Sequence, residues 1–119
     1  MTVDRHALRK WEKVREFALG LPGAAEEFPW GESVAKVGKK VFVFFGVADS
    51  DDAGMWVKLP ASQPLAVAQP GVKPATYGLG KAGWVSIRFA EAGLPPETLR
   101  EWIDESYRAV APKRIQAKG

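Results

Sequence analysis

Apolar residues recur along this chain with two periods, one typical of helices and the other of strands. Near the N-terminus they recur every three or four residues, and after Pro95-Pro96 the same spacing returns until Pro112. The first pattern, capped by Thr2 and running to Leu19, buries Ala7, Leu8, Trp11, Val14, Phe17, Ala18 and Leu21. The second buries Leu99, Trp102, Ile103, Ser106, Tyr107 and Val110. The sequence therefore predicts a helix near each end.

The strand pattern is strongest from Val41 to Val47, which reads VFVFFGV and is the longest apolar run. A short run of β-branched and aromatic residues bounded by glycines predicts a strand buried on both faces, here the central strand of the sheet. Gly38-Lys39 joins it to a shorter strand, Val34–Val37, and favours a type II′ turn. Further strands are predicted at Met55–Leu59 and Trp84–Phe89.

The remaining segments are shorter and richer in proline and glycine. Ser62 is the predicted cap of a short helix over Pro64–Ala68, and residues 23–32 are a predicted loop in which Trp30 fills the core edge. Residues 71–83 should be irregular, with a short strand near 76–79. The whole chain, 1–119, is then one α+β domain: a single antiparallel sheet of about 4–5 strands packed by N- and C-terminal helices, with a short middle helix.

Alternation along the predicted strands separates two kinds of side chain. If the aliphatic sides lie under the helices, the opposite face gathers Phe42, Phe44, Trp56 and Trp84 among Lys40, Lys58 and Arg88. Aromatic rings among cations are what a surface needs to stack bases and neutralise phosphates. Alternatively, a loop, the C-terminal helix or a second subunit covers the aromatics, because monomers rarely expose so large an apolar patch.

Charge is distributed unevenly along the chain, although the net charge is only +3. Residues 33–48 and 53–90 contain no acid, and their cations are Lys36, Lys39, Lys40, Lys58, Lys73, Lys81 and Arg88. Residues 91–107 hold five acids and a single arginine, Arg100. The predicted strands are thus basic and the last helix acidic, a segregation that orients a field toward an anionic partner.

Candidate catalytic and metal-binding patterns are weak. The chain has no cysteine and one histidine, His6, which excludes a thiolate nucleophile, a cysteine-ligated metal and a histidine triad. Gly78, Gly80 and Gly83 have the spacing of a dinucleotide-binding fingerprint, but a strand follows them where that motif requires a helix. The alternative is a tight glycine turn whose backbone amides, together with Lys81, bind a phosphate.

Two acidic pairs are likewise weak candidates for a metal site or a catalytic site. Asp49 and Asp51 match the first positions of a calcium-binding loop, but the twelfth position, which should be glutamate, is Pro60. Glu26 and Glu27 lack any visible catalytic partner. We therefore predict a protein that is not an enzyme and needs no cofactor. No apolar run approaches the ~18 residues of a membrane span, and no signal-peptide segment is visible, so we expect a cytoplasmic protein without a membrane partner.

Several short motifs occur in a characteristic order. They are Leu21-Pro22-Gly23 with Glu26-Glu27, Pro29-Trp30-Gly31, the stretch from Lys36 to Phe42, Lys58-Leu59, Tyr77-Gly78-Leu79-Gly80-Lys81 with Trp84, and Ser106-Tyr107. Together they resemble the MmcQ/YjbR family from Trp11 to about Ala111. The chain departs from the family pattern at Gly83, often histidine, and at Pro60-Ala61, often a polar turn.

The resemblance implies a compact domain similar to the frataxin/CyaY arrangement and to a double-wing DNA-binding fold. Frataxin-like iron binding uses an acidic first helix. The first predicted helix here carries five cations against three acids, Asp4, Glu12 and Glu16, so we expect no iron binding.

The leading hypothesis is a non-enzymatic, DNA-binding domain of low sequence specificity. The residues predicted to meet phosphates are Lys36, Lys39, Lys40, Lys58, Lys81 and Arg88, while Trp56 and Trp84 stack or wedge. The alternative is a small-molecule or protein-interaction module, homodimeric in one version, that uses the same aromatic face.

Overall fold

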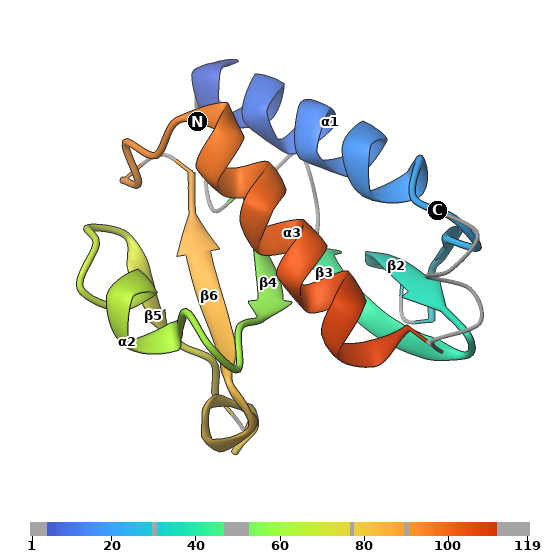
Figure 1. The fold of residues 1–119 in the computed structure, drawn as a ribbon. Coiled ribbons are helices and arrows are strands. Elements are labelled where there is room, and N and C mark those ends of the chain that lie inside the picture. Colours follow the sequence, from blue (N-terminus) through green and yellow to red (C-terminus); the bar gives the residue numbers. More distant parts are fainter. Residues whose placement is uncertain (1–4, 30, 47–52, 77, 90, 112–119) are drawn as a thin grey trace.

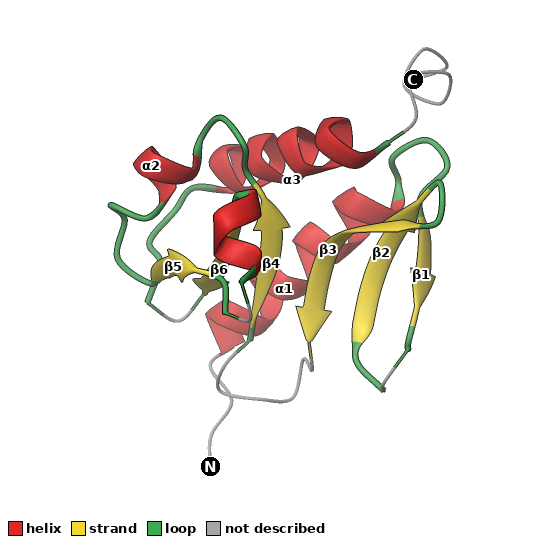
Figure 2. Ribbon diagram, turned by 90° about the horizontal axis from the view of Figure 1, so that it is seen from below, coloured by secondary structure: helices red, strands yellow, loops and turns green. Residues whose placement is uncertain are grey.

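The computed structural model describes residues 5–29, 31–46, 53–76, 78–89 and 91–111. Across these residues the chain forms one antiparallel sheet in the order β1-β2-β3-β4-β6-β5, with two long helices (Figures 1 and 2). The elements are α1 (Arg5–Leu19), β1 (Ala25–Glu27), β2 (Ser33–Val37), β3 (Lys40–Gly46), β4 (Gly54–Lys58), α2 (Gln63–Ala66), β5 (Val72–Pro74), the 3-10 helix η1 (Leu79–Ala82), β6 (Trp84–Arg88) and α3 (Pro96–Val110).

Both long helices lie side by side across one face of the sheet, as Figure 1 shows. The buried side of α3 consists of Leu99, Trp102, Ile103, Ser106 and Tyr107, as its spacing predicts. Val14 and Ala18 of α1 are buried in the same core. Each helix therefore stabilises the fold by burying its apolar side against the sheet. The predicted α+β architecture is confirmed; Thr2, Trp30 and Val47 lie outside the described residues.

Two edge strands were not predicted, so the sheet has six strands instead of four or five. β1 lies within the predicted loop and β5 within the predicted irregular segment. Each has three residues, too few for an alternation to be visible, and β5 ends in a proline that only an edge strand accepts. The strand expected near 76–79 is also wrong, because the described residues there lead into η1.

The β2–β3 hairpin turns through Gly38 and Lys39, since Val37 pairs with Lys40. Both turn residues have positive φ, 56° at Gly38 and 73° at Lys39. A type II′ turn has positive φ at its first central residue alone, so the predicted turn type is wrong and the pattern is that of type I′.

A bulge in β3 changes which way Phe42 points. Ala35 pairs with Val43 and Lys36 with Val41, which leaves Phe42 as an extra residue. Its ring is fully buried and meets the ring of Tyr107 in α3 edge to face at 5.4 Å. The prediction that Phe42 joins the face away from the helices is therefore wrong.

The middle helix is short and begins without a side-chain cap. Ser62 precedes α2, but its hydroxyl donates to Glu105 Oε1 of α3 at 2.6 Å instead of accepting from a backbone amide. Among the helices of the described chain, none is long and apolar enough to cross a membrane.

Candidate functional site

Phe44, Trp56 and Trp84 form a cluster on the sheet face opposite α1 and α3, which we term the aromatic face. Phe44 pairs with Trp56 across β3 and β4, and their ring centroids are 6.1 Å apart. Trp84 pairs with Lys58 across β6 and β4, and its ring lies 5.3 Å from that of Phe44. Alternation along the strands predicts this set, apart from Phe42.

The aromatic face is partly closed by its own side chains. Trp84 is 7% exposed, and Val34, which pairs with Phe44, is 1% exposed. Trp84 and Val34 are buried even though they do not belong to the core under the helices. Phe44 and Trp56 are half-buried. The edge-to-face contacts leave Trp84 inaccessible to a stacking base, while Trp56 keeps part of its ring accessible.

The lysines of the hairpin, of β4 and of η1 are distributed along one end of the sheet. β3 and β6 both run antiparallel to β4, so the β2–β3 turn, the end of β4 and η1 lie toward the bottom of Figure 1. We call this group the basic end; it comprises Lys36, Lys39, Lys40, Lys58 and Lys81.

Arg88, the sixth predicted cation, does not belong to the basic end. It pairs with Gly54 at the other end of the β4–β6 ladder, whereas Trp84 pairs with Lys58. Four residues of extended strand separate these positions by about 13 Å. Arg88 also forms an ion pair with Glu91 at 2.7 Å.

The lysines of the basic end are mostly without acidic partners. Lys36 Nζ lies 3.5 Å from Glu27 Oε1, a weak and exposed contact. Lys39, Lys40 and Lys81 are exposed and Lys58 is half-buried, and none of these four forms an ion pair with another described residue. Positive charge there is consequently available to an anionic partner.

Glu105 of α3 lies near this end, but hydrogen bonds hold its carboxylate. It accepts from the amides of Ala61 at 3.0 Å and Ser62 at 3.1 Å, in addition to the Ser62 hydroxyl. The contact ties the end of α3 to the turn after β4.

Ser106 joins α3 to a gap in the sheet. The β3–β4 ladder has two residue pairs, Val43 with Val57 and Phe44 with Trp56. Beyond them the fully buried Ser106 hydroxyl accepts from the Lys58 amide at 2.8 Å and donates to the Phe42 carbonyl at 2.5 Å. One side chain thus satisfies a backbone donor of β4 and a backbone acceptor of β3 beyond the last residue pair of their ladder.

Tyr107 anchors the neighbouring turn. Its hydroxyl donates to the Pro22 carbonyl at 2.7 Å, and burial raises the pKa of this phenol above its ordinary value. The Ser106-Tyr107 motif therefore has a structural role in this chain.

The two departures from the MmcQ/YjbR pattern, Gly83 and Pro60-Ala61, touch each other. The Gly83 carbonyl accepts from the Leu59 amide at 2.8 Å, and a Cβ at residue 83 would lie 3.2 Å from the Pro60 nitrogen. Gly83 also has a φ of 98°, which a side chain rarely adopts. The two departures from the family pattern therefore lie where the backbone at residue 83 packs closely against the backbone at residues 59 and 60.

Glu26 and Glu27 lie on β1 instead of a loop, and they point to opposite faces of the sheet. Glu26 accepts from Arg15 Nε at 2.6 Å, from Arg15 Nη2 at 2.5 Å and from the Ser33 hydroxyl at 2.6 Å. These donors, Arg15 foremost, hold the pKa of Glu26 below its ordinary value. Glu26 is thus a structural ion-pair partner of α1.

The other sequence candidates supply little chemistry. Gly78 and Gly83 bracket η1 with left-handed conformations, and β6 follows directly, so the helix of a dinucleotide fingerprint is lacking after Gly83. Within the described residues, no group of three acidic, histidine or cysteine side chains could hold a metal ion. Asp49, Asp51 and the side chain of His6 lie outside what the structure describes.

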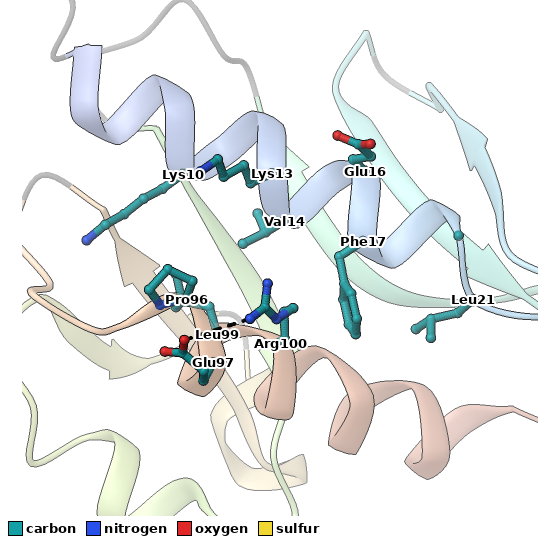
Figure 3. A pocket seen from close by; sticks show the side chains of 11 residues that line it. Lys10, Lys13, Val14, Glu16, Phe17, Leu21, Pro96, Glu97, Leu99 and Arg100 are labelled. Carbon is teal, nitrogen blue, oxygen red and sulfur yellow. Dashed lines mark ion pairs between the residues drawn. The ribbon is translucent and has the colours of Figure 1, made fainter.

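A groove between α1 and α3 was not predicted from the sequence. It encloses about 680 Å³, and Figure 3 shows charged side chains of both helices along an apolar floor. The sequence signal for it is the placement of Lys10, Lys13 and Arg100 beside the apolar stripes of two helices. Which stripes face one another depends on helix packing.

Comparison with known proteins agrees with the resemblance seen in the motifs. No curated protein matches the chain. The YjbR family model matches residues 19–109, a span that contains every strand of the sheet, η1 and nearly all of α3. Because this match covers well over half of the sequence, the chain belongs to the YjbR family.

Proposed function

We propose that the protein is a non-enzymatic, cytoplasmic DNA-binding domain of low sequence specificity that meets phosphates through the basic end. In this proposal the β2–β3 hairpin acts as a wing, and Lys58 and Lys81 extend the contact along the sheet end. The family assignment is compatible with the proposal but does not carry it.

The observation that carries the proposal is the placement of five lysines along one end of the sheet, four of them without an acidic partner among the described residues. Lysines that neutralise phosphates release condensed counterions, which supplies affinity without reading sequence. Ammonium groups give poor discrimination between bases, so low specificity follows from the same residues.

The backbone of Lys39 adds support. Its φ of 73° is the left-handed conformation, which costs a residue with a side chain about 1–2 kcal/mol compared with glycine. Gly or Asn is the usual choice at this turn position, so a lysine there exchanges stability for a cation at the hairpin tip. Strained residues of this kind are common at functional sites.

The two tryptophans have different roles in this proposal. Trp56 is half-buried and lies two residues before Lys58, on the opposite side of the β4 backbone from the helices, so its accessible ring can contact a base or sugar. Trp84 is 7% exposed and supports Phe44 and the aromatic face instead.

The test is fluorescence anisotropy with labelled random single-stranded and duplex DNA at about 50 and 200 mM salt. The wild type should bind with a steep salt dependence. Lys39→Glu plus Lys40→Glu should weaken binding and flatten the log–log salt slope by about two. Arg9→Glu plus Lys13→Glu on α1 is the matched control, since it changes net charge equally at exposed residues on the helix side. Absence of binding at the lower salt, or equal effects of both variants, would refute the proposal.

Lys39→Gly separates binding from folding. Glycine adopts the left-handed turn without strain, so the free energy of unfolding should be unchanged or higher by up to about 1 kcal/mol. Loss of one phosphate contact should reduce the salt slope by about one. A slope equal to that of the wild type would remove Lys39 from the interface.

The aromatic face favours one second candidate, a protein-interaction or small-molecule module. Phe44 and Trp56 stay half-buried outside the core under the helices, where another subunit could cover them. Sedimentation equilibrium tests the homodimer version: a wild-type monomer eliminates it, whereas a dimer that Trp56→Asp dissociates supports it.

A further inference from the structure

The groove between α1 and α3 has an apolar floor. Val14 and Leu99 are buried at its base, and the half-buried Phe17 and Leu21 form one wall. Figure 3 shows the Phe17 ring pointing from α1 toward α3. A volume of about 680 Å³ lies within the usual range of small-molecule sites, which are apolar with a few placed polar groups.

Positive charge is in excess along the groove, because its lining contains three cations and two acids. They are Lys10, Lys13, Arg100, Glu16 and Glu97. Lys10 donates to the Ala92 carbonyl at 3.1 Å and so is held toward the loop before α3. In Figure 3 the Glu16 carboxylate points away from α3, so this acid does not oppose a ligand within the groove.

Arg100 is the cation best placed for a ligand. Figure 3 shows its guanidinium extending from α3 toward α1, above the apolar floor. Its contact with Glu97 is long, 3.9 Å, and both side chains are at least half exposed, 50% and 71%. Exposed contacts of this kind are weak, so a carboxylate can replace Glu97 and gain the two parallel hydrogen bonds that a guanidinium offers.

We propose that this groove binds a small amphipathic monoanion, an apolar body ending in one carboxylate. The body lies on Val14, Phe17 and Leu99, and the carboxylate meets Arg100. A carboxylate complements the excess of cations along the groove and meets the one guanidinium above its floor (Figure 3), whereas a neutral ligand leaves that charge uncompensated. The site lies on the helix side of the sheet, so the proposal is independent of DNA binding.

The test uses sodium octanoate, below its micelle concentration, with backbone NMR shifts as the readout. Saturable shifts concentrated in residues 13–21 and 96–100 are expected. Octan-1-ol, which has the same chain without charge, should bind at least about tenfold more weakly, since charge-assisted hydrogen bonds contribute about 1.5–3 kcal/mol. Equal affinity for both compounds, or shifts centred elsewhere, would overturn the proposal.

Three variants locate the carboxylate. Arg100→Met keeps much of the apolar stem and should weaken octanoate about tenfold without affecting octan-1-ol. Glu97→Gln removes the competing acid and should tighten octanoate about twofold or more. Arg108→Met is the matched control: it lies on the same helix, pairs with Asp104 at 2.8 Å and is outside the groove, so binding should not change. Equal losses in Arg100→Met and Arg108→Met would contradict the assignment.

Discussion

The two faces of the sheet are closed by different means. Under α1 and α3, aliphatic side chains pack against helices until residues such as Val43 and Val57 are fully buried. On the aromatic face, Phe44, Trp56 and Trp84 pack mainly against one another, and two of them stay half-buried. Cations border this second face, whereas two long helices cover the first (Figure 1). One sheet thus has a fully buried core on one face and partly accessible aromatic rings on the other.

A single strand contributes to both faces in a way that alternation does not predict. Phe42 and Phe44 should share a face, yet the bulge turns Phe42 toward Tyr107 and leaves Phe44 beside Trp56. The buried Ser106 hydroxyl then satisfies the backbone at the gap. The bulge thus adds the Phe42 ring to the core under the helices.

Truncating Phe42 and Phe44 should reveal the largest difference in stability between the two faces of the sheet. Phe42→Ala should lower the free energy of unfolding by about 3–5 kcal/mol, because a fully buried ring leaves a cavity. Phe44→Ala should cost roughly half as much, since its ring is half-buried. Urea unfolding measures both. Equal losses would mean that the aromatic face is as tightly closed as the core.

Ser106→Ala should lower the free energy of unfolding by about 1–3 kcal/mol, because the Lys58 amide and Phe42 carbonyl lose their partner inside the core. Ser86→Ala on the aromatic face is the control; as a half-buried surface change it should stay within about 0.5 kcal/mol. Similar values for the two serines would argue against a bridging role for Ser106.

The two ends of the aromatic face should differ in DNA binding. Lys58→Gln at the basic end should reduce the salt slope by about one, with a modest loss of affinity. Arg88→Gln at the other end should change the slope less, because Glu91 already compensates that charge at 2.7 Å. Anisotropy at several salt concentrations compares them. A larger effect at Arg88 would move the interface to that end.

The smallest expected effect concerns the ion pair between α1 and β1. Glu26 has a lower pKa in the folded than in the unfolded chain, so its contribution is complete above the ordinary value near 4.5 and is lost as pH falls through the folded value. Solvent screening of Arg15, whose side chain is 36% exposed, limits this contribution to about 0.5–1 kcal/mol.

Urea midpoints of the wild type and Glu26→Gln should therefore differ at neutral pH and converge in acid. A difference that persists below the pKa of folded Glu26 would show that its charge is not the cause.

Much of the fold follows from local patterns in the sequence. The buried stripes of both helices, the four long strands and the shared face of Phe44, Trp56 and Trp84 are all visible as periodicities. The acid-free strands and the family motifs are likewise local features. The sequence also shows six cations, but not that Arg88 lies apart with Glu91.

The tertiary structure alone decided which distant segments contact one another. Examples are the β1 and β5 edges, the turn of Phe42 toward Tyr107, the placement of Lys39, Lys58 and Lys81 at one end of the sheet, and the groove between α1 and α3. Periodicity determines which side of an element is apolar, because side-chain direction repeats with the backbone. Which sides meet depends on strand order, bulges and helix packing, and these are set by the burial of the whole core.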